Sequence, residues 1–185
     1  MTSLEQTLVA VARFLRTKKI PYMVIGGAAN LFWGVPRTTL DVDVTVQVQE
    51  DRLSALVDEI KKCFQSRVKD TQSFVAKMSV LPLQDASGIR IDLIFARLPY
   101  EFRAIRRAKT KRVAGESVRI CSPEDLIIHK IISDRPRDQE DVRGIIERVG
   151  PALDRKYLDP AVKDLAREFA KPGIFDFYLR CFDRK

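Results

Sequence analysis

The sequence predicts an α+β protein, with a mixed β-sheet core flanked by helices and a C-terminal helical segment after it. Short apolar or strictly alternating runs, such as 22–25 and 40–48, are separated by stretches with helical periodicity up to about residue 121. After about residue 136 the periodicity is helical throughout. We therefore expect an α/β core over residues 1–121 and a helical part over residues 122–185 that packs on it.

Length and composition indicate an ordinary globular protein. The chain has 185 residues, of which 45% are hydrophobic and 31% are charged, enough to bury a substantial core. Three widely spaced cysteines and one histidine argue against a disulfide framework or a zinc site. No signal peptide and no membrane-spanning run is recognisable, so we expect a cytoplasmic protein with no membrane partner.

The first half of the chain opens with an amphipathic helix over residues 3–17. Ser3 and Gln6 suggest a capping box, and leucine and valine residues recur at helical spacing after them. The other elements expected here are a buried strand at 22–25, a turn at Gly26-Gly27, a helix over 28–33, a strand over 40–48 and a helix over 51–66.

The second half continues with two strands and then helices. We expect strands at 73–81 and 88–96, a helix from Pro99 and a hairpin over 111–120 that turns at 114–116. Ser122 is a candidate N-cap with Pro123 at the first helical position, which begins the helical part.

Aspartate is disfavoured in strands, yet Asp41 and Asp43 lie within the alternating run 40–48. Their Cα atoms would be roughly 6.6 Å apart on one face of the strand, opposite the valines. Asp92 lies mid-strand in 88–96. If the two strands are neighbours, three carboxylates converge, and their mutual repulsion calls for a cation. Oxygen ligands suit Mg²⁺ or Mn²⁺, and such ions can assist a phosphoryl transfer.

Residues suited to holding phosphate surround this run. Gly26-Gly27 before a helix would let the backbone approach a phosphate at the helix N-terminus. Arg37 and Lys130 could hold further phosphate oxygens. Each feature alone has an ordinary alternative: a turn, a solvated strand face or a surface lysine. Their order along the chain is what makes the combination informative.

The segment "GGAANLFWGVPRTTLDVDVTV" resembles the signature of the nucleotidyltransferase superfamily with a DNA polymerase beta-like fold. Within it, the segment is most similar to AbiEii-type toxins and related GG-containing nucleotidyltransferases. "RIDLIF" matches the strand of the third carboxylate, and "SPEDLIIHKIISDRPRDQEDV" is similar to a later helical motif. The matching positions are Gly26, Gly27, Gly34, Arg37, Thr39, Asp41, Asp43, Asp92, Lys130, Arg137, Asp138 and Asp141.

The resemblance implies a metal-dependent transfer of a nucleoside monophosphate from an NTP to an acceptor hydroxyl. Asp41, Asp43 and Asp92 would be the catalytic metal ligands, with Asp92 as the candidate base. Gly26, Gly27, Arg37, Thr39, Lys130 and Asp141 would bind the nucleotide. The cofactor would be Mg²⁺ or Mn²⁺, with the NTP as donor substrate.

The acceptor is less defined by the sequence. Residues 97–112 carry seven basic side chains and the net charge is +8, which suits either a solvated surface or a track for RNA phosphates. The resemblance favours an RNA acceptor, such as a tRNA 3′ end, and an antitoxin protein as a partner. A small hydroxyl compound of the antibiotic type, a protein side chain, and a non-catalytic nucleotide- or RNA-binding module remain alternatives.

Overall fold

The computed structural model describes residues 2–183, which form two compact units. The sheet unit comprises the described residues up to 28 together with 38–121, and the helical unit comprises 29–37 together with the described residues from 122. The sequence did not indicate that 29–37 group with the C-terminal helices. No helix within residues 2–183 has the length and apolar character needed to span a membrane.

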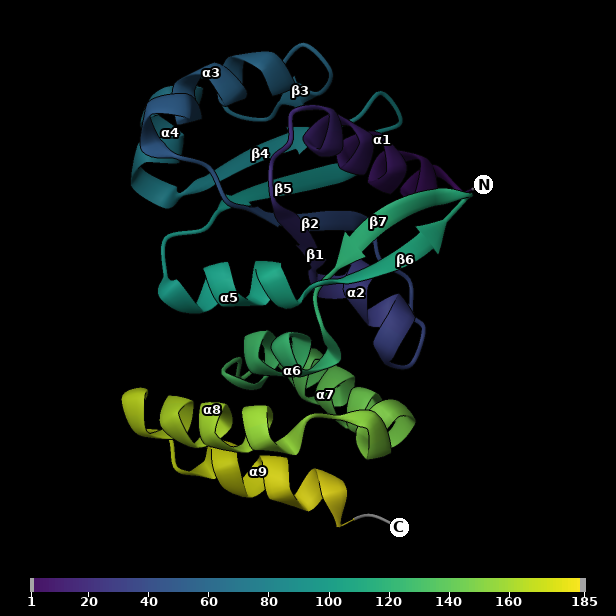
Figure 1. The fold of residues 1–185 in the computed structure, drawn as a ribbon, viewed down its shortest axis with the longest axis vertical. Coiled ribbons are helices and arrows are strands. Elements are labelled where there is room, and N and C mark those ends of the chain that lie inside the picture. The colour runs from purple at the N-terminus through teal and green to yellow at the C-terminus, as the bar shows by residue number, and fades with distance from the viewer. Residues whose placement is uncertain (1, 184–185) are drawn as a thin grey trace. The chain divides into compact units, whose positions relative to one another are not determined.

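The sheet unit is built on a seven-stranded mixed sheet with the order β3-β4-β5-β2-β1-β7-β6 (Figure 1). β2 is parallel to β5 and β1 is parallel to β7, whereas the other neighbours are antiparallel. This architecture confirms the predicted α+β class. The strands are β1 Tyr22–Ile25, β2 Asp41–Val46, β3 Gln65–Ser66, β4 Val80–Gln84, β5 Arg90–Phe95, β6 Lys109–Val113 and β7 Glu116–Ile120.

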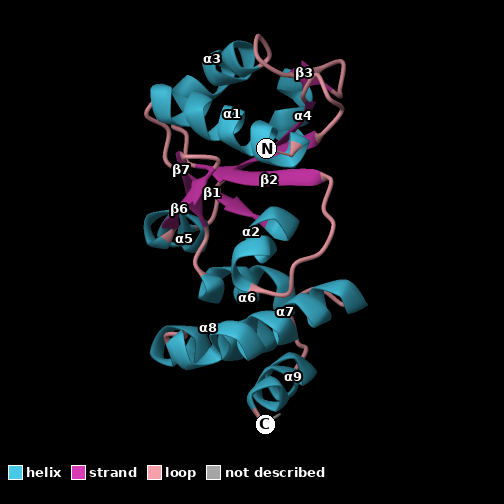
Figure 2. Ribbon diagram, turned by 90° about the vertical axis from the view of Figure 1, so that its right-hand side faces the viewer, coloured by secondary structure: helices cyan, strands magenta, loops and turns pink. Residues whose placement is uncertain are grey.

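Helices cover the two faces of this sheet unequally. α1 (Ser3–Thr17), α3 (Glu50–Ile60) and α4 (Thr71–Met78) lie on one face, and α5 (Pro99–Arg107) lies on the other (Figure 2). The even-numbered valines of β2, 42 to 46, are fully buried, and β2 therefore turns its aspartates away from them.

Several local predictions needed adjustment at helix ends. The N-cap of α1 is Thr2, not Ser3, and its capping box uses Glu5. α2 (Gly26–Trp33) begins at the glycine pair itself, without a separate turn. α3 ends at Ile60, six residues earlier than expected, because turns and the short β3 follow it.

The prediction of a strand over 73–81 was wrong, since most of this segment forms α4. Asp70 caps that helix by accepting a hydrogen bond from the Ser73 amide at 3.1 Å, and Ser79 ends it in the left-handed conformation. The apolar residues of 73–81 fit both the helical and the strand period, and the N-cap at Asp70 favours the helix. The strand begins only afterwards, as β4.

The helical unit contains α6 (Pro123–Ile131), α7 (Pro136–Val149), a 3₁₀ turn (Gly150–Ala152), α8 (Arg155–Glu168) and α9 (Gly173–Phe182). Ser122 caps α6, as the sequence predicts. Tyr178 of α9 is fully buried, so the aromatic C-terminal segment packs within this unit. The guanidinium of Arg155 lies 3.9 Å from the ring centre of Phe182 and reinforces that packing.

Candidate functional site

The three aspartates picked out by the sequence lie on two adjacent parallel strands of the sheet unit. Asp43 of β2 is in register with Asp92 of β5, and Asp41 is in register with Arg90. Side chains two residues apart share a face, so all four project from the same side of the sheet. The strand pairing on which the carboxylate hypothesis depended is therefore present.

We call the side of the sheet that carries Asp41, Asp43 and Asp92 the carboxylate face. Gly26, at the start of α2, lies against it. Its φ is +66°, and a Cβ added there would lie 1.9 Å from Oδ2 of Asp43. Only glycine tolerates both the backbone conformation and the approach. Gly27 follows in the first helical turn, and Thr39 Oγ1 donates to the Asp41 carbonyl at 3.4 Å.

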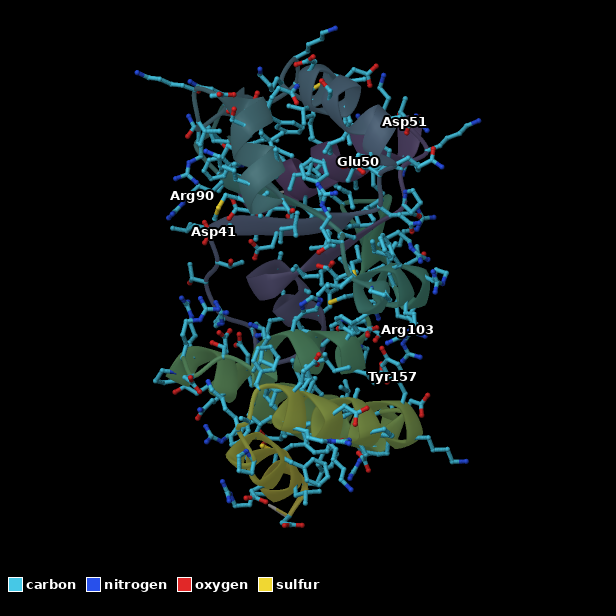
Figure 3. The ribbon with its side chains drawn as sticks, turned by 90° about the vertical axis from the view of Figure 1, so that its left-hand side faces the viewer. Asp41, Glu50, Asp51, Arg90, Arg103 and Tyr157 are labelled. Carbon is cyan, nitrogen blue, oxygen red and sulfur yellow. The ribbon has the colours of Figure 1, made fainter. Side chains whose placement is uncertain are left out.

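Asp41 lies beside a positive charge on this face. Arg90 Nε lies 3.1 Å from Asp41 Oδ1, and both side chains are about half exposed (Figure 3). Oδ1 nevertheless has no hydrogen-bond partner, so this contact is an ion pair of poor hydrogen-bond geometry. Burial raises the pKa of Asp92 above its ordinary value; the charge of Arg67 opposes this shift and that of Asp41 adds to it.

Two arginines lie beside the carboxylates. The alternation in 88–96 places Arg90 on the face of Asp92, although the sequence interpretation gave it no role in the site, whereas Arg67 was missed. The amide of Arg67 donates to the Pro82 carbonyl at 2.9 Å, and Pro82 is in register with Asp92. Arg67 lies in a loop after β3, where no periodic signal exists.

The donor set fits a hard divalent cation, although the side chains are not gathered around one point. No group of three histidine, cysteine, aspartate or glutamate side chains within residues 2–183 is arranged to hold a metal ion. The unmet hydrogen-bonding capacity of Asp41 Oδ1 and the all-oxygen chemistry are what Mg²⁺ or Mn²⁺ would require.

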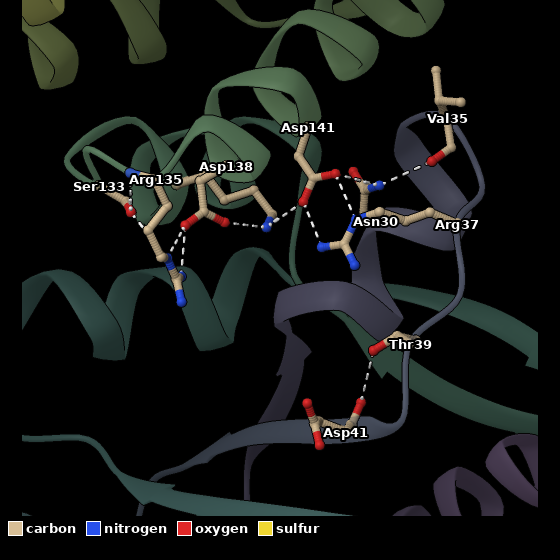
Figure 4. Close-up of polar contacts among 10 residues, drawn as sticks. Asn30, Val35, Arg37, Thr39, Asp41, Ser133, Arg135, Asp138 and Asp141 are labelled. Atoms are coloured by element: carbon tan, nitrogen blue, oxygen red, sulfur yellow. Dashed lines mark hydrogen bonds and ion pairs between the residues drawn. The ribbon is translucent and has the colours of Figure 1, made fainter.

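The remaining predicted site residues, Arg37, Lys130 and Asp141, lie in the helical unit. Together with Asp138 they form a largely buried cluster that we call the ion cluster. Figure 4 shows Arg37, Asp138 and Asp141 of this cluster. Arg37 donates two hydrogen bonds to the Asp141 carboxylate, from Nε to Oδ1 at 2.9 Å and from Nη2 to Oδ2 at 2.7 Å. Lys130 Nζ lies 2.9 Å from Asp138 and 2.7 Å from Asp141.

The centre of the ion cluster is almost sealed from solvent, and Arg135 adds a third cation at its edge, 2.6 Å from Asp138. The side chains of Lys130 and Asp141 are 7% and 4% exposed. Burial alone would raise the pKa of Asp141, but hydrogen bonds from Arg37 and Lys130 outweigh it and lower that pKa. The pKa of Asp138 is lowered in the same way, with Lys130 as its main partner. The ammonium of Lys130 is thus held between two carboxylates.

A family comparison decides the class of this chain. Residues 3–168 match the family described as "Nucleotidyltransferase of unknown function (DUF6036)". The chain belongs to this family. The superfamily resemblance read from the sequence is therefore correct, while the AbiEii-type branch is not selected by this match.

Solved structures support the fold of this nucleotidyltransferase. The antibiotic-resistance factor ANT(2″)-Ia superposes with a TM-score of 0.61 at 16% identity, over 94% of this chain and 97% of that one. An antigenic nucleotidyltransferase-like protein from Paracoccidioides brasiliensis gives 0.59 at 19%, over 95% and 91%. The lincosamide antibiotic adenylyltransferase LnuA gives 0.54 at 10%, over 78% and 96%. The comparison with curated proteins finds no match.

Proposed function

We propose that this nucleotidyltransferase moves a nucleoside monophosphate from an NTP to an acceptor hydroxyl. The observation that carries the proposal is the register of Asp43 with Asp92 on parallel strands, next to a glycine that leaves no room for a Cβ beside Asp43. Carboxylates on adjacent strands, beside a helix that begins with glycines, combine cation ligands with a place for phosphate.

Each residue of the carboxylate face has a proposed role. Asp41, Asp43 and Asp92 would hold Mg²⁺ or Mn²⁺, which when bound neutralises phosphate charge and stabilises the leaving pyrophosphate. Gly26 would allow the backbone of α2 to approach the triphosphate closely. Asp92 would orient the acceptor hydroxyl and accept its proton, as the resemblance suggests.

The ion cluster supports a refinement of the nucleotide-binding roles. Asp141 is bonded to both Arg37 and Lys130, so we propose that it positions these cations rather than touching the nucleotide. Lys130 and Arg37 remain the proposed phosphate contacts of this unit. Because Asp138 and Asp141 already satisfy the Lys130 ammonium, any such contact would compete with two ion pairs.

We propose RNA as the acceptor. Arg67 and Arg90 beside Asp92 attract a phosphodiester backbone and would repel a cationic antibiotic, and the net charge of +8 acts in the same direction. The antibiotic adenylyltransferases share the fold at identities of 10 to 16%, which leaves the acceptor open. An aminoglycoside acceptor would call for an acidic surface instead.

Transfer of label tests both the reaction and the acceptor. Each NTP, labelled at the α-phosphate, would be incubated with the protein, Mg²⁺ and separate pools of cellular RNA, protein and aminoglycosides. We expect label in RNA, and none with the Asp43→Asn variant. Label in the protein or aminoglycoside pool would overturn the RNA proposal, and label in no pool despite NTP binding would overturn the enzyme proposal.

The resemblance to AbiEii-type toxins leads us to propose, in addition, a toxin role neutralised by an antitoxin protein. Induced expression in a bacterial host should then arrest growth, whereas expression of Asp43→Asn at an equal protein level should not. Equal growth of the two strains would remove the toxin role and leave the transfer reaction standing.

A further inference from the structure

A pocket lined by basic side chains lies in the sheet unit, away from the carboxylates. A pocket of about 620 Å³ opens between the C-terminal ends of α1 and α5 and the β6–β7 hairpin. This volume is within the usual range for ligand sites. Four basic side chains line it, namely Arg16, Lys19, Arg106 and Arg119, and no acidic side chain does.

The four cations are not equivalent. Arg16 forms an ion pair with Glu116 at 3.0 Å, and Arg119 Nη2 donates to the carbonyls of Ile105 and Arg106. Those carbonyls are neutral, so the positive charge of Arg119 stays uncompensated. The side chains of Lys19 and Arg106 make no hydrogen bond or ion pair within residues 2–183, and both residues are exposed. Three positive charges therefore face the pocket without a counter-charge.

The rest of the lining also suits an anionic ligand with an apolar part. Thr110 and Ser117 supply hydroxyl groups, and Ile20, Pro21 and Ile105 supply apolar surface. A single carboxylate would leave most of the positive charge unmatched, whereas a phosphate group and its neighbours would balance it. The chemistry that fits is thus a phosphate-bearing ligand.

The register of β1 separates this pocket from the carboxylate face. Tyr22, which lines the pocket, begins β1, whereas Ile25 at its other end is in register with Asp43. Three residues of strand place these points about 10 Å apart. The pocket therefore opens at the end of β1 away from the aspartates.

We propose that this pocket binds the phosphate groups of a second ligand, distinct from the NTP held at the aspartates. Of the seven basic residues in 97–112, only Arg106 lines it, so the site is assembled from four segments rather than from one basic stretch. The ligand is either a free polyphosphate or nucleotide, or the phosphodiester backbone of RNA, and both share the recognised group.

Charge-loss variants with matched controls test the pocket. Lys19→Gln/Arg106→Gln removes its two unpaired cations, and Lys69→Gln/Arg103→Gln removes two exposed cations that do not line it. All proteins would carry Asp43→Asn, so that binding is measured without turnover and independently of the proposed reaction. The probes are tripolyphosphate, ATP and a short labelled single-stranded RNA at fixed ionic strength.

We expect the pocket variant to bind the RNA at least about tenfold more weakly and the control to bind within a factor of about two. The slope of log affinity against log salt should fall by about 1.4 for the two lost contacts. A parallel loss for tripolyphosphate and ATP would identify a free phosphate ligand, and a loss for RNA alone would identify the backbone. Equal losses in the pocket and control variants, or none in the pocket variant, would overturn the proposal.

Discussion

Asp92 of the sheet unit and Asp141 of the helical unit are both largely withdrawn from solvent, yet their surroundings act in opposite directions. Burial raises the pKa of Asp92, while hydrogen bonds from Arg37 and Lys130 lower that of Asp141. A raised carboxylate pKa opposes folding at neutral pH, and a lowered one favours it. The surroundings of Asp92 therefore oppose its ionisation in the folded protein, whereas the partners of Asp141 stabilise both its charge and the fold.

The largest expected effect separates activity from stability on the carboxylate face. Asp43→Asn should lower transfer by about 10³-fold, because a lost cation ligand removes several kcal/mol of charge stabilisation. Its free energy of unfolding should stay within about 0.5 kcal/mol of wild type. Transfer assays and urea unfolding would be run in parallel, with Asp58→Asn on the exposed side of α3 as the control.

A substitution in the ion cluster should, in contrast, strongly lower the free energy of unfolding. Asp141→Asn leaves Arg37 and Lys130 without their shared carboxylate, which should cost about 3–5 kcal/mol and lower Tm by about 10 °C. Asp164→Asn is the matched control, since it breaks an exposed ion pair with Arg167 on α8. Equal melting temperatures for the two variants would remove the stabilising role of the cluster.

The pH dependence of the destabilisation by Asp141→Asn should show whether it arises from the lost negative charge. Asp138 and Asp141 have folded-state pKa values below their unfolded values of about 3.9, so their contribution is complete above that value. It is lost as the pH falls through the lower folded pKa values. The difference in urea midpoint between wild type and Asp141→Asn should therefore narrow below about pH 4. A difference that stays constant down to pH 3 would assign the effect to packing instead.

Glycine substitutions at two positions with positive φ should have effects of intermediate size. Gly26→Ala must meet both a positive φ and the Asp43 carboxylate, whereas Gly88→Ala meets a positive φ with no atom within 4 Å. We expect about 1–2 kcal/mol for Gly88→Ala and a larger loss for Gly26→Ala, measured by urea unfolding. Only Gly26→Ala should also impair transfer. Equal costs and unchanged transfer would show that the approach of Gly26 to Asp43 is irrelevant.

Arg90→Gln should give the smallest effect, because its ion pair with Asp41 is half exposed. The unfolding free energy should change by less than about 1 kcal/mol. Removing the competing positive charge should tighten binding of Mn²⁺ alone by up to about fivefold, as measured by calorimetry without nucleotide. Arg103→Gln is the control. Weaker Mn²⁺ binding by Arg90→Gln would contradict the placement of a cation at Asp41.

The sequence predicted the sheet better than the helix ends. Alternation in 40–48 and 88–96 marked β2 and β5 and placed their aspartates on one face, because one face of each strand is buried. The segment 73–81 was misread, since the local cap at Asp70 outweighed an ambiguous apolar pattern. Neither capping nor periodicity could show that 29–37 group with distant helices, because that grouping depends on tertiary contacts.

The sequence indicated several residues of the candidate site but not the charges that surround them. Sequence order alone indicated Gly26, Asp43 and Asp92, which the fold brings together. It could not show that Lys130 is enclosed by Asp138 and Asp141, because ion pairs between helices depend on their packing. Arg67 was missed for the same reason, since it reaches the site from a loop.

The position of a label in the donor NTP reports directly on the transfer of a nucleoside monophosphate. The protein would be incubated with RNA and Mg²⁺ and with the same NTP labelled either at the α- or at the γ-phosphate. We expect label in RNA from the α-position only, with the γ-label released in pyrophosphate. Label entering RNA from the γ-position, or from neither position, would contradict it.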